Sequence, residues 1–98
     1  MSVQAFAINI PQTTLDDLRE RLARTRWPDE VEGAGWDYGT NVGYLKELVD
    51  YWQHAFDWRT QEEKLNQFAQ FRAEIDGVSI HFVHERAKRL GGIPLILA

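Results

Sequence analysis

The sequence predicts an α/β protein in which helices precede strands, so that the chain itself is of the α+β kind. Three patterns lead to this prediction. Apolar residues recur every three or four positions through much of residues 15–56, as in amphipathic helices. Apolar and polar residues then alternate over residues 71–83 around Asp76-Gly77, as in a β-hairpin. Residues 93–98 are apolar throughout, which is typical of a strand buried on both faces of a parallel sheet.

Composition and charge narrow the classes of function. The chain has 98 residues, enough for one domain, and a hydrophobic content of 44% that is ordinary for a globular protein. A net charge of −4 argues against nucleic acid as a partner, because phosphate binding needs a basic surface. There is no cysteine for disulfides or thiolate chemistry. Neither a membrane span nor a signal peptide is recognisable, so we expect a cytoplasmic protein that is not associated with a membrane.

The first residues predict an edge strand followed by a helix. Residues 6–10 alternate and stop at Pro11, which favours an extended segment at a sheet edge. Thr13 or Thr14 is expected to cap the helix, because each has an acid three residues later. The helix should end before Trp27-Pro28, since the residue before proline avoids the α region. Its apolar side is expected to hold Leu15, Leu18 and Leu22.

Four arginines in this first helix resemble a basic patch. They are Arg19, Arg21, Arg24 and Arg26. Asp17 and Glu20 precede two of them by four residues, a spacing that forms ion pairs on a helix surface. We therefore expect a solvated helix face and no site for an anion.

The middle of the chain predicts a loop and a second helix. Residues 29–40 contain three glycines, but no strand precedes them and no P-loop lysine follows, so we expect an irregular loop pinned by Trp36 and no phosphate cradle. Asn41 is expected to cap a helix over residues 42–55. One stripe of that helix should comprise Val42, Leu45, Val49, Trp52 and Phe56. The aromatic-rich stretch Tyr51–Arg59 has two interpretations, an aromatic core or a docking surface.

A third helix and a hairpin complete the predicted elements. Thr60–Glu63 has the T-x-x-E pattern of a capping box, which predicts a short helix start there, with Leu65 and Phe68 buried. A two-residue turn at Asp76-Gly77 fixes the hairpin register. The predicted apolar pairs are Ile75 with Val78, Ala73 with Ile80, and Phe71 with Phe82. The predicted polar pairs are Glu74 with Ser79, and Arg72 with His81. The buried strand at residues 93–98 lacks neighbours, so we expect the rest of its sheet to lie outside this chain.

None of the candidate catalytic or metal-binding residues forms a convincing site in the sequence. His81 and His84 are three apart in a strand and point to opposite faces, and His54 has no histidine four residues away. Ser79 lies in mid-strand, away from any sharp nucleophile turn. Asp57 is more simply a loop or cap acceptor beside Arg59. Glu62 and Glu63 are adjacent and point apart. We therefore expect no catalytic residue, no cofactor site and no metal site in this segment.

The order of motifs resembles the N-terminal region of the microsomal-type epoxide hydrolases, an α/β-hydrolase family. The matching pieces are F-A-I-N-I-P (Phe6–Pro11), D-L-R-E-R-L-A-R-T-R-W-P (Asp17–Pro28), G-W-D-Y-G (Gly35–Gly39), Y-W-Q-H-A-F-D-W-R (Tyr51–Arg59), L-N-Q-F-A-Q-F (Leu65–Phe71) and I-D-G-V-S-I-H-F-V-H-E-R (Ile75–Arg86). Each piece is weak alone, but six in order are specific and cover nearly the whole chain.

The resemblance implies a division of roles along the polypeptide. Residues 1–69 would be the family's N-terminal helical meander, and residues 70–98 would be the first strands of the hydrolase core. Residues 93–98 would lead into an H-G-W-P loop. The family's aspartate nucleophile, its histidine base and its two lid tyrosines would lie beyond that loop, so Tyr38, Tyr44 and Tyr51 do not correspond to the lid tyrosines. No family catalytic position falls on this chain.

Two functions follow as alternatives. The chain is either the N-terminal segment of a soluble epoxide hydrolase, supporting catalytic and lid regions supplied by the remainder of the same polypeptide, or a stand-alone family-derived binding or dimerisation domain. The first implies a small-molecule epoxide as the substrate of the whole enzyme. The second implies a partner or a homodimer contact through the aromatic surface.

Overall fold

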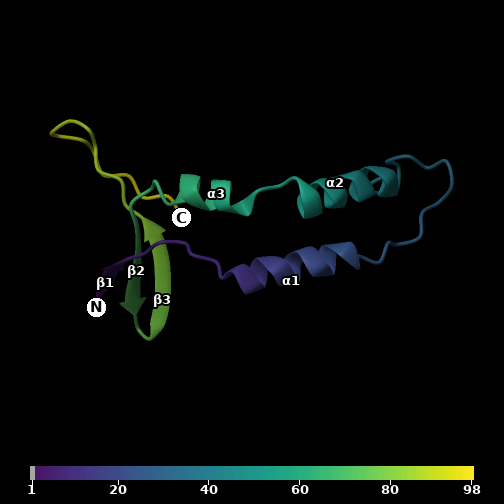
Figure 1. Cartoon of the computed structure of the whole chain (residues 1–98). Coiled ribbons are helices and arrows are strands. Elements are labelled where there is room, and N and C mark those ends of the chain that lie inside the picture. Colours follow the sequence, from purple (N-terminus) through teal and green to yellow (C-terminus); the bar gives the residue numbers. More distant parts are fainter. Residues whose placement is uncertain (1) are drawn as a thin grey trace. The chain divides into compact units, whose positions relative to one another are not determined.

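The computed structural model describes residues 2–98 and contains three helices and a three-stranded sheet (Figure 1). The elements are β1 (Val3–Ala5), α1 (Gln12–Ala23), α2 (Val42–His54), α3 (Trp58–Leu65), β2 (Gln70–Ile75) and β3 (Val78–Val83). They fall into two compact units. One comprises Asn9–Trp58, and the other comprises the residues up to Ile8 together with Arg59–Ala98.

Helix α1 begins and ends earlier than the sequence predicts. Pro11 occupies the N-cap position without a side-chain bond, and its carbonyl accepts from the amides of Thr14 and Leu15 at 3.0 and 3.4 Å. The prediction of a threonine cap is therefore wrong, because both threonines already lie in the first turn. The helix ends at Ala23, where the Thr25 hydroxyl donates to the Leu22 carbonyl at 2.7 Å and closes the last turn.

The two faces of α1 are arranged as predicted. Leu15 is buried, while Leu18 and Leu22 are half-buried, and α1 packs against α2. On the solvent side Arg21 pairs with Asp17 at 2.9 Å, and Arg24 pairs with Glu20 at 2.7 Å. The arginines of α1 thus belong to a solvated face with local ion pairs.

One carboxamide oxygen and one carboxylate oxygen accept hydrogen bonds from backbone amides at the start of α2. The Asn41 side chain accepts from the Tyr44 amide at 3.0 Å, which confirms the predicted cap, and Glu30 Oε2 accepts from the Val42 amide at 2.6 Å. The apolar side chains of this helix are half-buried or exposed, and none is fully buried. Val42, Leu45 and Val49 are half-buried, whereas Tyr44, Leu48, Tyr51 and Trp52 remain exposed. The aromatic stretch is therefore not a closed core within this chain.

Replacing Asn41 by alanine is expected to lower the free energy of unfolding by about 1 kcal/mol, because the Tyr44 amide loses its acceptor. Denaturant unfolding of the full polypeptide measures this change. Asn41→Asp keeps an acceptor oxygen and should cost far less. Equal losses in both variants would contradict the role of the cap.

Helix α3 differs from its prediction in its start and in its buried side. It begins at Trp58, so the T-x-x-E pattern at Thr60 lies inside the helix and does not start it. Leu65 and Phe68 are exposed, the latter by 54%, because no described element covers that side. The buried residue is instead Glu62, which is 8% exposed and accepts from the Arg59 guanidinium at 2.9 Å.

The sheet has the order β1-β2-β3 and is antiparallel throughout. All five predicted hairpin pairs are confirmed, from Ile75 with Val78 to Phe71 with Phe82. Asp76 and Gly77 have φ of 49° and 79°, the left-handed pair that a tight two-residue turn requires and that glycine adopts without strain. The sheet does have a short edge strand at Val3–Ala5, but the predicted position at residues 6–10 is wrong.

The predicted strand over residues 93–98 does not form within the described part of this chain, where the neighbours expected for it are absent. These residues have no regular secondary structure, and Ile96 is 90% exposed. Strands obtain their backbone partners from neighbouring strands, and the described residues offer none to this segment. Among residues 2–98, no helix has both the length and the apolar character needed to cross a bilayer. The proposed domain boundary between residues 69 and 70 stays a prediction.

Candidate functional site

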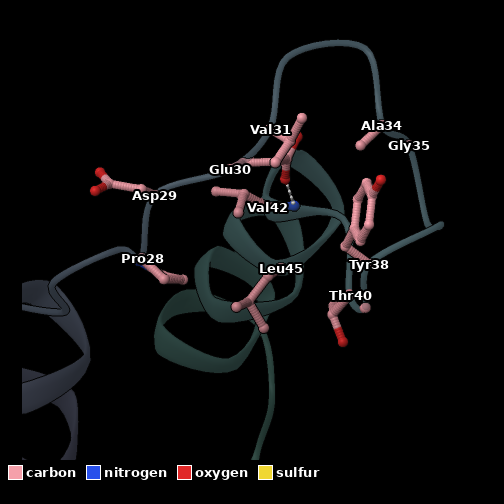
Figure 2. A pocket seen from close by; sticks show the side chains of 11 residues that line it. Pro28, Asp29, Glu30, Val31, Ala34, Gly35, Tyr38, Thr40, Val42 and Leu45 are labelled. Carbon is pink, nitrogen blue, oxygen red and sulfur yellow. Dashed lines mark hydrogen bonds between the residues drawn. The ribbon is translucent and has the colours of Figure 1, made fainter.

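One pocket lies where the loop after α1 meets the start of α2. It has a volume of about 360 Å³ (Figure 2). Its lining is Pro28, Asp29, Glu30, Val31, Ala34, Gly35, Tyr38, Gly39, Thr40, Val42 and Leu45. The loop residues turn back over the start of the helix, which places the Glu30 side chain beside Val42, whereas the Asp29 carboxylate points away from them (Figure 2). The pocket is therefore mixed in character.

Two side-chain oxygens at or beside this pocket accept from backbone amides at the start of α2. Glu30 is committed to the Val42 amide, and Asn41 to the Tyr44 amide. Trp36 contacts the Tyr44 ring at 5.2 Å between centroids, so it fixes the loop on the helix as predicted. Two free amides at a helix start would attract an anion, but here side-chain oxygens take both. That this glycine-rich loop is not a phosphate cradle stays a prediction.

Each of the three histidines has different hydrogen-bond partners. His54 Nδ1 lies 3.1 Å from both the carbonyl and the carboxylate of Asp50, one turn earlier in the same helix. His81 Nε2 lies 2.9 Å from Gln70 Oε1. His84 follows β3, and its backbone amide donates to the Ala69 carbonyl at 3.0 Å. Within residues 2–98, no three His, Cys, Asp or Glu side chains gather around one point where a metal ion could bind.

The remaining candidates are also placed in structural positions. Ser79 pairs with Glu74 across the hairpin. Asp57 directly precedes α3. Glu62 is engaged with Arg59. That this segment holds no nucleophile, histidine base and acid arranged for transfer through an enzyme ester stays a prediction.

Sequence reasoning missed a network of side-chain amides beside the sheet. Asn66 Nδ2 donates to the Ile8 carbonyl and Asn66 Oδ1 accepts from the Ile8 amide, both at 2.8 Å. The buried Gln70 side chain donates to the Leu65 carbonyl at 2.9 Å and to Asn66 Oδ1 at 3.2 Å. Its Oε1 must then accept, so His81 carries a proton on Nε2. Nothing in local sequence signals these bonds, since the Asn66 and Ile8 partners are 58 residues apart.

The fold defines the class: three helices combined with a three-stranded antiparallel sheet in an α/β protein. The family model described as "Epoxide hydrolase N terminus" matches residues 3–98. The chain belongs to this family, and the resemblance seen in its motifs is confirmed.

Proteins of similar sequence and structure support this family assignment. The chain is 35% identical to Epoxide hydrolase 1 of Sus scrofa over 89 residues, which are 91% of this chain and 20% of that protein. An enantioselective mutant of the Aspergillus niger epoxide hydrolase superposes with a TM-score of 0.85 at 31% identity, over 96% of this chain and 25% of that one.

The juvenile hormone epoxide hydrolase of the silkworm Bombyx mori gives a TM-score of 0.83 at 30% identity, over 94% of this chain and 24% of that one. These likenesses confirm the α/β-hydrolase fold class. The chain spans between a fifth and a quarter of the length of these relatives.

Proposed function

We propose that this chain is the structural N-terminal segment of an epoxide hydrolase and that later residues of the same polypeptide carry out the chemistry. The match of residues 3–98 to the epoxide hydrolase N terminus is the observation that carries the proposal. The large exposed apolar surface supports it. Tyr51, Phe68 and Ile96 are all exposed, and a soluble domain gains stability when such side chains are covered.

The chemistry proposed for the whole enzyme proceeds through an ester. An aspartate carboxylate attacks an epoxide carbon, which forms a C–O bond and breaks the ring C–O bond. Two lid tyrosines hydrogen-bond the ring oxygen, and one of them gives it a proton as the C–O bond breaks. Histidine then removes a proton from water, which attacks the ester carbonyl and releases the vicinal diol together with the free carboxylate, and the proton on histidine returns to the tyrosine. All of these groups are proposed to lie outside residues 1–98.

Isotope transfer in a single turnover of the full polypeptide tests this mechanism. With enzyme in excess over epoxide in ¹⁸O-water, the first diol should contain ordinary oxygen, because its new oxygen comes from the carboxylate. The label should then appear in the enzyme. A first diol that carries ¹⁸O would contradict the ester and indicate direct attack by water. No diol at all would overturn the assignment as an epoxide hydrolase.

The exposure of the α2 surface favours a second candidate function, a stand-alone binding or dimerisation domain. Tyr44, Leu48 and Tyr51 recur at helical spacing and are all exposed. Light scattering after size-exclusion chromatography of the natural protein separates the two functions. A natural product of about 11 kDa that forms dimers would support the second function, and a longer, epoxide-hydrolysing product would overturn it.

Two attributes accompany the main proposal. The substrate is proposed to be a small-molecule epoxide, and the enzyme is proposed to act in the cytoplasm. Cell fractionation with an antibody to the natural protein checks the second attribute: recovery with the membranes would contradict a cytoplasmic location.

A further inference from the structure

Residues 2–8, which we call the N-terminal strap, follow the outer edge of β2 (Figure 1). Phe6 and Ile8 are half-buried, but all three residues of β1 are exposed, so apolar burial does not explain why β1 is held there. The strap supplies hydrogen-bond partners for the backbone of β2. The Glu74 amide donates to the Ser2 carbonyl at 3.2 Å, and the Phe6 amide donates to the Gln70 carbonyl at 2.9 Å. These bonds bracket most of the length of β2.

The end of the strap is fastened by the Asn66 side chain. Its amide group bonds both the N–H and the carbonyl of Ile8 at 2.8 Å, which reproduces the paired bonds of a β-bridge. Asn66 also accepts from the buried side chain of Gln70, the first residue of β2. The anchor therefore connects the strap to the strand that the strap covers.

A second anchor holds Phe6 on the face of the sheet. The Phe6 and His81 rings meet edge to face with centroids 5.2 Å apart, and the Arg72 guanidinium lies 4.5 Å from the centre of the Phe6 ring. Arg72 and His81 are cross-strand partners in β2 and β3. Phe6 therefore contacts two side chains that are paired across β2 and β3. These contacts fix the register of the strap on β2.

Without the strap, β2 would be an exposed edge of six residues with apolar Phe71, Ala73 and Ile75 in alternation. Such an edge is a template for pairing with another chain, whereas a short edge such as the three-residue β1 is a poor one. We propose that the N-terminal strap is an edge cover that keeps β2 from pairing with β2 of a second copy of this chain. Antiparallel pairing of two identical strands has two-fold symmetry, so the association that the strap prevents is a dimer.

Proline substitutions at two adjacent strap positions test this proposal in the full polypeptide. Hydrogen-bonded residues alternate along an antiparallel pair, so Gln4, between Ser2 and Phe6, directs its amide to β2, whereas Ala5 directs its amide outward. Gln4→Pro therefore removes a ladder bond and disturbs the strap. Ala5→Pro is the matched control, since an outward-facing edge position tolerates proline.

The readouts are amide hydrogen exchange of Arg72 and Glu74, which face the strap, and mass by light scattering over a series of concentrations. In Gln4→Pro we expect faster exchange at low concentration and a doubling of mass as concentration rises, with Ala5→Pro like the wild type. An excess of the synthetic peptide of residues 2–8 should return the mass to the wild-type value. Faster exchange with an unchanged mass, or an oligomer that the peptide does not dissolve, would overturn the proposal.

If circular dichroism shows that Gln4→Pro is unfolded, Asn66→Ala decides the question with the same two readouts. It removes both bonds to Ile8 and leaves the strap sequence intact. We expect Asn66→Ala to dimerise only at a higher concentration than a protein whose strap is fully released, because the bonds of Ser2 and Phe6 to β2 remain. A detached strap with wild-type mass at every concentration would overturn the proposal here too.

Discussion

Arg59→Ala is expected to destabilise the full polypeptide by about 2 kcal/mol, because it removes two charge-assisted hydrogen bonds from a nearly buried carboxylate. The Arg59 guanidinium donates to both oxygens of Glu62, at 2.9 and 3.2 Å. The Glu62 side chain is 11% exposed and that of Arg59 is 40% exposed. The loss falls at the lower end of the range for broken buried pairs, since Arg59 retains access to water.

The exposed pair in α1 is the matched control. Arg21 and Asp17 are 77% and 57% exposed at the same separation of 2.9 Å, so Arg21→Ala should change stability by no more than about 0.5 kcal/mol. Denaturant unfolding of both variants at the same salt concentration gives the comparison. Equal losses for Arg59→Ala and Arg21→Ala would show that burial of Glu62 has no energetic consequence.

Ile96→Asp is expected to prevent the full polypeptide from accumulating in soluble form, although Ile96 is almost fully exposed in this chain. The continuous apolar run at residues 93–98 is typical of a strand that is buried on both faces once its neighbours are present. An unpaired carboxylate at such a position costs at least about 3 kcal/mol. The soluble fraction after expression and the thermal midpoint of any soluble protein measure the effect.

Leu90→Asp supplies the comparison for that variant. Leu90 is a fully exposed apolar residue in the loop between β3 and this segment. The same apolar-to-acid change should be tolerated there. If Ile96→Asp is as soluble and as stable as Leu90→Asp, residues 93–98 do not form a buried strand in the whole protein.

Local signals predicted the parts of the fold that local chemistry determines. Asp76-Gly77 fixes a two-residue turn, and the turn fixes every pair of the hairpin. Asn41 reaches an amide three residues away, so its cap is visible in the sequence. The ion pairs of α1 span one turn. In each case the two partners are close in the chain, and the rules of helices and turns are sufficient.

The errors arise where the outcome depends on distant residues or on residues outside the chain. Thr13 and Thr60 have cap patterns, but Pro11 and Trp58 start the helices earlier, because more than one residue can occupy a cap position. Leu65 and Phe68 were expected to be buried, but burial needs a covering element and none of the described elements provides one.

The candidate site was harder to predict than the fold. The pocket over residues 28–45 depends on how the loop turns back on α2, which no periodicity encodes. The bond between Asn66 and Ile8 joins positions 58 apart, so neither residue signals it locally. The motif order that identified the family succeeded because it used the whole chain at once.

The proposed structural role is tested by comparing epoxide turnover for three proteins: residues 1–98 alone, the full polypeptide, and the full polypeptide without residues 1–98. Diol formation from a series of small epoxides, followed by chromatography, is the measurement. We predict turnover by the full polypeptide, none by the isolated segment, and loss of folded, active enzyme when the segment is removed. Turnover by the isolated segment, or undiminished turnover without it, would contradict a purely structural role for this chain.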